Sequence, residues 1–152
     1  MSTNATRAWC TFRIDGRLYG VAADRVQEVL RAAPLTPVPL SPAAVRGLIN
    51  LRGEIVTVVD LRRPLQLPGA APASPTLVVV QDGGGITTLA VDAIEDVLWT
   101  REEDFEPCPD TLHAAAREML LGCYKLPHDL LLVLNLERAL GASALSAGPA
   151  AA

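Results

Sequence analysis

Residues 46–61 constrain the fold of this chain more than any other stretch. Leu48–Leu51 is mostly apolar, and Ile55–Val59 is rich in β-branched side chains, which favour strands over helices. Between them, Arg52-Gly53-Glu54 provides a polar turn with a glycine that tolerates positive φ. The pattern predicts a β-hairpin with a charged tip. Because Ile55–Val59 does not alternate with polar residues, we expect its strand to be covered on both faces.

A second copy of this hairpin lies 75 positions further along the chain. Its turn is Pro127-His128-Asp129, and the matched residues are Gly47 and Gly122, Leu51 and Leu126, Glu54 and Asp129, Val58 and Val133, Asp60 and Asn135, and Leu61 and Leu136. Asp92–Leu98 likewise resembles Asp24–Leu30, which lies 68 positions upstream. Two matches in the same order indicate one supersecondary unit used twice.

Short apolar runs separated by turn residues predict further strands. The expected hairpins pair Trp9–Ile14 with Leu18–Val21 through Asp15-Gly16, and Thr76–Gln81 with Ile86–Val91 through a loose glycine-rich turn. Val26, Val29 and Leu30 recur at the spacing of a helix and predict one or two helical turns within residues 22–30, with Asp24 as a cap or first-turn acid. Strands at these intervals predict two small barrels of four or five strands each.

Proline and small residues mark the connections. We expect an extended segment over residues 33–42, a short helical turn from Ser41-Pro42 to Val45, and a linker over residues 64–75 between the two copies. Residues 112–121 suit a short helix or a mobile loop, and residues 137–140 begin a brief helix. The predicted domain spans residues 9–140. Its first subdomain covers about 9–63 with packing from the C-terminal segment, its second covers about 76–140, and residues 1–8 and 141–152 are expected to be flexible tails.

Composition excludes several classes of protein. The net charge of −4 argues against nucleic-acid binding. The three cysteines, Cys10, Cys108 and Cys123, are widely spaced and form no CxxC, so we expect buried thiols in a reducing compartment and neither a disulfide framework nor a zinc site. The first eight residues lack an apolar core, and no apolar run approaches the roughly 18 residues of a membrane span. These features predict a cytosolic protein with no membrane insertion.

The chain offers little that resembles catalytic chemistry. His113 and His128 are expected to be solvated loop or turn residues, Gly83–Gly85 to be a hairpin tip and not a phosphate cradle, and Glu102–Asp104 to be a solvated acidic loop and not a cation site. We therefore expect no catalytic residue, no metal and no cofactor, and a function carried by the surface.

Arg52 at the hairpin tip is the most pointed surface candidate. It suits a bidentate contact with a partner carboxylate, or an internal salt bridge to Glu28 or Glu54, and the sequence leaves both open. Val26, Val29, Ile94 and Val97 also have two interpretations. Their periodicity favours core positions, and the alternative is an apolar groove between the copies that receives a partner helix.

These residues resemble a known family. Residues 45–62 are similar to the signature of the CheW family of bacterial chemotaxis coupling proteins, and so are Tyr19–Val21 with Val26–Val29, Val91–Leu98 and Leu132–Leu136. The resemblance runs from about Trp9 to Leu140. Thr57 stands where the family often has proline, residues 34–42 are richer in proline than usual, and two alanines precede Asp24.

The resemblance implies two five-stranded, SH3-like barrels around a shared hydrophobic core. It also implies a non-enzymatic adaptor that joins the cytoplasmic hairpin tip of a chemoreceptor to the regulatory domain of a CheA-type histidine kinase. The partner-binding residues that it implies are Arg52, Glu28, Val26, Val29, Gly47, Ile94 and Val97. Two alternatives remain: a small enzymatic or ligand-binding barrel, in which His113 and the acidic loop meet in the groove between the halves, and a detached copy of the kinase regulatory domain.

Overall fold

Two five-stranded sheets account for the strands of the computed structural model, which describes residues 5–31, 33–38, 45–69, 72–83 and 85–140. The strands are β1 (Thr6–Ile14), β2 (Arg17–Ala22), β3 (Val26–Leu30), β4 (Val45–Leu51), β5 (Glu54–Asp60), β6 (Thr76–Asp82), β7 (Gly85–Val91), β8 (Ala93–Arg101), β9 (Leu120–Leu126) and β10 (Asp129–Leu134). The short helices are the 3₁₀ turns η1 (Ala23–Arg25) and η2 (Glu102–Asp104), and α1 (Ala114–Arg117) and α2 (Leu136–Leu140).

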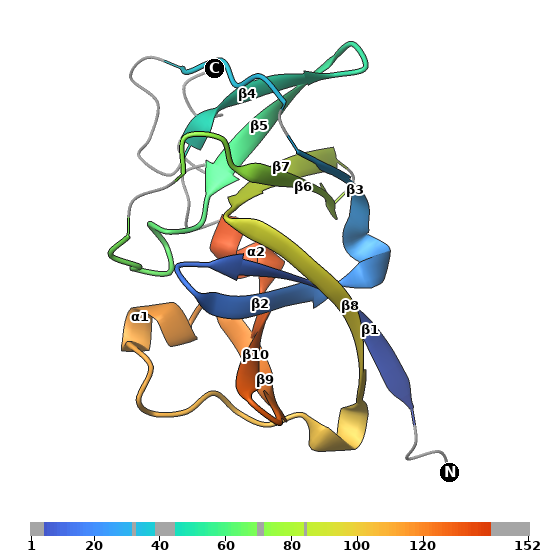
Figure 1. Ribbon diagram of the computed structural model, residues 1–152, viewed down its shortest axis with the longest axis vertical. Coiled ribbons are helices and arrows are strands. Elements are labelled where there is room, and N and C mark those ends of the chain that lie inside the picture. Colours follow the sequence, from blue (N-terminus) through green and yellow to red (C-terminus); the bar gives the residue numbers. More distant parts are fainter. Residues whose placement is uncertain (1–4, 32, 39–44, 70–71, 84, 141–152) are drawn as a thin grey trace.

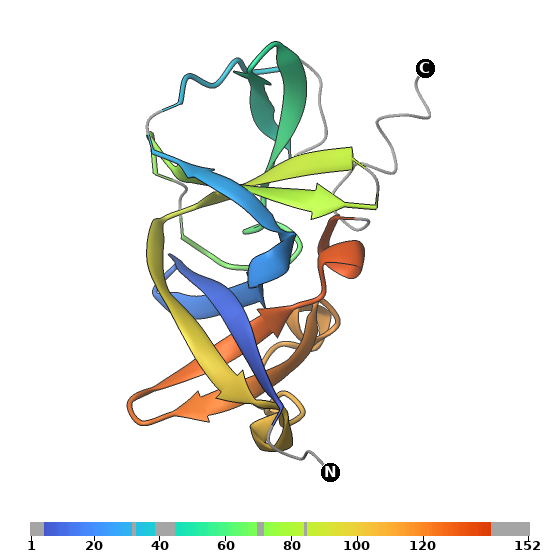
Figure 2. The same cartoon turned by 90° about the vertical axis from the view of Figure 1, so that its right-hand side faces the viewer.

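The two sheets form two barrels, one above the other in Figure 1. One has the order β8-β1-β2-β10-β9 and draws on both ends of the chain, so we call it the terminal barrel. The other has the order β3-β6-β7-β5-β4 and is the central barrel. Figure 2 shows β8 running from the level of the central barrel down along the terminal barrel. The prediction of a mainly β fold with two five-stranded barrels is confirmed.

The expected division into residues 9–63 and 76–140 is wrong, because the two copies exchange strands. The chain crosses between barrels after β2 and again after β7, so β3, β4 and β5 pair with β6 and β7, while β8, β9 and β10 join β1 and β2. Each sequence copy therefore gives two strands to one barrel and three to the other. Neither copy contains a complete barrel.

The duplication extends to the registers of the strands. In both barrels one pair is parallel, β2 with β10 and β5 with β7. In the central barrel, Val78 pairs with Val29 on one side and with Leu89 on the other. Cys10 is its counterpart in the terminal barrel, 68 positions earlier, and pairs with Val97 and Val21. The same offset of 68 relates Val29 to Val97 and Val21 to Leu89. The bulge between Val45 and Gly47 is likewise repeated in the β9–β10 pair. The two barrels are thus related residue by residue.

Alternate residues of the inner strands face different cores. In β6, Val78 and Val80 belong to a large cluster shared by both barrels, whereas Leu77 and Val79 belong to the interior of the central barrel. Trp9, Leu18, Tyr124, Leu131 and Val133 form the interior of the terminal barrel. A strand between two cores buries both faces, which explains apolar runs without polar alternation. The expectation for β5 is confirmed at Val58 and Val59, which are fully buried in different clusters, and is wrong at Ile55, which is 62% exposed.

The predicted helical turns over residues 22–30 are wrong beyond η1, because Val26–Leu30 is a strand. Val26 pairs with Val80 and Val29 with Val78, and the register shifts between Val26 and Glu28. An extra residue in a strand changes the spacing on one face from two to three, which imitates helical periodicity. Asp24 lies in the first turn of η1, where no side chain makes a capping hydrogen bond.

Other segments agree in part with their predictions. Residues 6–8, expected to be disordered, belong to β1. Residues 112–121 hold both α1 and the start of β9, and the brief C-terminal helix is α2. Thr36 pairs with Leu48, so part of the proline-rich segment is extended along β4. The predicted turn at Ser41-Pro42 and the predicted tails 1–4 and 141–152 lie outside the described residues.

Candidate functional site

The β4–β5 turn presents Arg52 at the tip of the hairpin. Arg52 and Gly53 both have positive φ, at 52° and 91°, as a two-residue hairpin turn requires. The side-chain oxygen of Asn50 accepts a hydrogen bond of 2.7 Å from the amide of Gly53 and fixes the turn. The local sequence therefore places the guanidinium of Arg52 on a turn of fixed backbone conformation.

Arg52 forms an internal ion pair with Glu28, one of the two acids that the sequence left open. Its Nη1 lies 3.1 Å from Oε1 of Glu28, and its Nη2 donates to Oε2 in a bidentate contact. β3 and β4 are the two outer strands of the central sheet, so the pair spans the seam of the central barrel. The hydrogen bond from Arg52 lowers the pKa of Glu28, against the smaller effect of burial, and the charge of Arg52 lowers it further.

The ion pair leaves much of the guanidinium accessible. The side chain of Arg52 is 65% exposed and that of Glu28 is 24% exposed. An exposed pair of this kind contributes little to stability. It does hold the guanidinium in one orientation, so a partner carboxylate or carbonyl can meet a preoriented cation.

The four apolar candidates divide between core and surface. Val26 and Ile94 are partly buried and pack on the shared core, Val29 is partly buried, and Val97 is 53% exposed. Val97 lies opposite Cys10, which belongs to the shared core, and Val29 lies opposite Val78, which also does. The core interpretation therefore suits Val26 and Ile94, whereas Val97 is available to a partner.

Gly47 is buried and has a structural role at the hairpin. A Cβ at this position would lie 2.6 Å from the carbonyl oxygen of Thr36, because the extended segment crosses directly over it. Gly122 is its counterpart, with Phe105 and Glu106 crossing over it in the same way. In both copies, the lack of a side chain at the glycine leaves room for the segment that passes over it.

The sequence did not single out an apolar surface on the terminal barrel. Trp99, Leu121 and Phe105 are 70%, 57% and 41% exposed. Leu121 and Phe105 lie at a hollow of about 400 Å³ that is also lined by the buried rings of Trp9 and Tyr124. The signal available in the sequence was the occurrence of Trp99 and Phe105 close together in a chain with only 4% aromatic residues.

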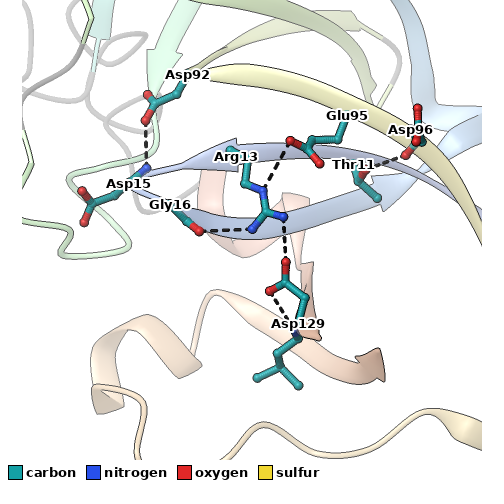
Figure 3. Close-up of polar contacts among 9 residues, drawn as sticks. Thr11, Arg13, Asp15, Gly16, Asp92, Glu95, Asp96 and Asp129 are labelled. Atoms are coloured by element: carbon teal, nitrogen blue, oxygen red, sulfur yellow. Dashed lines mark hydrogen bonds and ion pairs between the residues drawn. The ribbon is translucent and has the colours of Figure 1, made fainter. Parts of the chain in front are cut away.

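Charged residues also connect the two barrels. Arg62, which follows β5, donates to Asp92 between β7 and β8 at 2.8 and 3.0 Å, and Asp92 accepts from the amide of Asp15 at 2.9 Å. Within the terminal barrel, Arg13 contacts Asp129 at 2.7 Å (Figure 3). Burial alone would raise the pKa of Asp92, but the hydrogen bonds from Arg62 and Asp15 and the charge of Arg62 together lower it.

The remaining candidates for chemistry do not come together. His113 caps α1 by accepting from the amide of Ala115, and His128 is exposed in the β9–β10 turn. Glu102–Asp104 forms the exposed turn η2, and Gly83 and Gly85 belong to the β6–β7 hairpin. Cys10 and Cys123 are buried, Cys108 is partly buried, and all three thiols are free. Within the described residues, no three side chains of His, Cys, Asp or Glu are grouped as metal ligands.

Comparison with known proteins agrees with this geometry. The sequence model of the CheW-like domain matches residues 9–144. The chain belongs to the CheW-like family. It is 30% identical over 136 residues to the chemotaxis protein CheW of Rhizobium meliloti strain 1021, covering 89% of this chain and 88% of that one. It is 34% identical over 111 residues to protein FrzA of Myxococcus xanthus, covering 72% and 69%.

A solved CheW structure extends the likeness to three dimensions. The scaffolding protein TtCheW of Thermoanaerobacter tengcongensis superposes with a TM-score of 0.76 at 26% identity, over 86% of this chain and 90% of that one. This neighbour has the two-barrel SH3-like fold that the resemblance implied. The relative from Rhizobium meliloti is named a chemotaxis protein and the solved neighbour a scaffolding protein, and neither is named as an enzyme. No helix within the described residues is long and apolar enough to span a membrane.

Proposed function

We propose that this CheW-like protein is a chemotaxis coupling adaptor that holds chemoreceptors and a histidine kinase in one assembly. The observation that carries the proposal is the exposed guanidinium of Arg52, fixed by Glu28 across the seam of the central barrel in a chain that belongs to a family of scaffolding proteins. A preoriented cation on a rigid turn suits recognition of a protein surface and performs no chemistry by itself.

The two partners follow from the family resemblance. One is the cytoplasmic hairpin tip of a chemoreceptor, and the other is the regulatory domain of a CheA-type kinase. This assignment implies a protein that works in the cytoplasm and is recruited to receptor arrays at the membrane. It needs no cofactor, because both tasks are binding.

Residues on β3, in the β4–β5 turn and on β8 are proposed to make the partner contacts. Arg52 and Glu28 supply the polar part, and Val26, Val29, Ile94 and Val97 supply the apolar part on β3 and β8. Gly47 is buried, so its proposed contribution is indirect: it lets residues 36–37 cross β4 and fixes the base of the hairpin.

The other functions considered from the sequence have less support. The relatives reported above are named as chemotaxis, Frz and scaffolding proteins, which supports neither an enzyme nor a kinase. Glu102 of the acidic loop lines the hollow of about 400 Å³ on the terminal barrel, but His113 does not, so the two do not meet in that pocket.

Replacement of Arg52 by alanine tests the proposal. We expect binding to a receptor fragment or to a kinase regulatory domain to weaken at least about tenfold, because a central arginine anchor is lost. The melting temperature should change by less than about 3 °C, since the ion pair is exposed. Pull-down with purified partners, beside a melting curve, measures both.

Lys125→Ala is the matched control. Lys125 is 73% exposed and pairs with Glu106 at 3.5 Å, so it resembles Arg52 in exposure and pairing but lies on the terminal barrel. It should retain binding to both partners. Unfolding of the Arg52→Ala variant, or unchanged binding to both partners, would assign Arg52 a purely structural role and contradict the proposal.

A further inference from the structure

A polar hollow of about 370 Å³ opens on the central barrel. Its lining residues are Gln27 on β3, Glu54 on β5, Gln81 on β6, and Gly85 and Ile86 on β7. The volume far exceeds the roughly 30 Å³ that one water molecule occupies in the liquid. The hollow can therefore admit a side chain.

Each lining residue has a counterpart in the terminal barrel. Gln81 pairs with Ile86 in the central barrel, as Arg13 pairs with Leu18 in the terminal barrel, at an offset of 68 positions. The same offset relates Gln27 to Glu95, and both lie where the register of an outer strand shifts. The hairpin offset of 75 relates Glu54 to Asp129, since each is the first residue of its strand. The two barrels thus present matching positions at this place.

In the terminal barrel, an arginine of the chain itself occupies this place. The guanidinium of Arg13 lies 2.7 Å from Oδ2 of Asp129, 3.5 Å from Oε2 of Glu95 and 3.1 Å from the carbonyl oxygen of Gly16. Figure 3 shows the three acceptors around the one guanidinium, with the acids on β8 and β10. Two of these acceptors, Asp129 and Glu95, correspond to Glu54 and Gln27, which line the hollow of the central barrel.

In the central barrel, the matching residue is too short and uncharged. Gln81 stands where the terminal barrel has Arg13, so no cation among the described residues pairs with the carboxylate that corresponds to Asp129. That carboxylate, Glu54, is exposed and makes no hydrogen bond or ion pair through its side chain with any residue that the structure describes. The side-chain oxygens of Gln27 and Gln81 add two neutral acceptors. The counterpart of Gly16 lies outside the described residues.

The nearby cations are already engaged. Arg25 donates to the carbonyl oxygen of Gln81 at 3.0 and 2.9 Å and pairs with Glu137 at 3.2 Å. Arg52 is held by Glu28. Glu54 therefore remains the carboxylate at the hollow that is open to a cation from outside.

We propose that this hollow binds an arginine side chain of a partner protein, in the place where the terminal barrel holds its own Arg13. The inference rests on the proposed adaptor function only for the existence of a protein partner. A guanidinium offers five donors in a planar fork, which suits one carboxylate and two amide oxygens better than the compact ammonium of lysine does. The partner would thus complete in the central barrel the set of contacts that the terminal barrel makes internally.

An NMR titration of the protein alone tests the site with a defined probe. Nα-acetyl-arginine amide should bind weakly and shift the amide resonances of Gln27, Glu54 and Gln81. Nα-acetyl-citrulline amide, which has nearly the same shape and no charge, should cause little shift at equal concentration. Nα-acetyl-lysine amide should bind less tightly than the arginine probe.

Two variants locate the probe. Glu54→Gln should weaken binding of the arginine probe about fivefold, the effect of losing one charge-assisted contact at a solvated site. Gln81→Arg should fold, place its own guanidinium beside Glu54 and abolish the response to the probe. Glu118→Gln, which removes an exposed acid next to α1, should change nothing.

Equal responses to the arginine and citrulline probes, or an unchanged affinity in both Glu54→Gln and Gln81→Arg, would overturn the assignment. Because the titration contains no receptor or kinase, its failure leaves the pull-down result with Arg52→Ala untouched. A normal titration together with unchanged partner binding in Arg52→Ala would instead contradict the proposed function alone.

Discussion

Replacing Arg62 by alanine is expected to lower the free energy of unfolding by about 2–4 kcal/mol. The side chain of Arg62 is only 9% exposed. Besides its two hydrogen bonds to Asp92, its Nε donates to the carbonyl oxygen of Gly69 at 3.0 Å. Its removal leaves the partly buried carboxylate of Asp92 without a cation at the crossing between the barrels. Urea unfolding of the variant and the native protein measures the difference.

The opposite crossing provides the matched control. Arg25 lies where the chain crosses from β2 to β3, and it pairs with Glu137, which follows β10, at 3.2 Å. In this pair the crossing carries the arginine, whereas in the Arg62–Asp92 pair the crossing carries the acid. The side chains of this pair are 31% and 69% exposed, and Arg25→Ala should cost about 1 kcal/mol or less. Equal losses in the two variants would contradict the importance assigned to the buried pair.

The pH dependence distinguishes loss of charge from loss of packing. Burial raises the pKa of Asp92, but Arg62 and the amide of Asp15 lower it overall. A lowered pKa stabilises the fold above the unfolded value of about 3.9, and this stabilisation is lost as the pH falls through the folded pKa. Arg62→Ala should therefore lose less stability than the native protein when the pH is lowered below about 4.

Gly122→Ala is expected to destabilise the protein by about 2–4 kcal/mol. A Cβ at Gly122 would lie 2.6 Å from the carbonyl oxygen of Glu106 and would also overlap the ring of Phe105. The backbone of Glu106 cannot withdraw easily, because it exchanges hydrogen bonds of 2.9 and 2.8 Å with Cys123. Thermal and urea unfolding should both report the loss.

Gly16→Ala separates crowding from backbone conformation. Gly16 has a φ of 78° in the β1–β2 turn, and a Cβ there would meet nothing within 4 Å. Its cost should be about 1 kcal/mol, from positive φ alone. A loss at Gly122 no greater than the loss at Gly16 would show that the segment over β9 can move aside.

The repeated hairpins were predictable because their signal is local. The turn chemistry at Arg52-Gly53 and the β-branched run after it specify a hairpin without reference to the rest of the chain. The second copy at residues 122–136 repeats the same positions, so the duplication could be found by comparing the chain with itself. The prediction of two barrels follows from these observations.

The exchange of strands could not be predicted in this way. Which barrel receives β3 depends on its pairing with β6, some fifty residues away, and no local pattern in residues 26–30 encodes that partner. The bulge at Gln27 even gave β3 a helical spacing. Tertiary pairing overrode the periodicity at this point.

The candidate site was predictable in its residues and only partly in its contacts. The sequence named Glu28 and Glu54 as acids for Arg52, and the closure of the central barrel selects Glu28 because β3 and β4 are its outer strands. The contacts of Arg13 and Arg62 depend on the registers of strands far apart in the sequence. For that reason, neither arginine stood out before the fold was known.

Analytical ultracentrifugation of three purified components tests the central claim most directly. The native chain, a receptor hairpin fragment and a kinase regulatory domain should sediment together as one species, and the Arg52→Ala variant should fail to form it. If the chain binds only one of the two partners, or if they exclude each other, the protein does not couple them and the account is wrong.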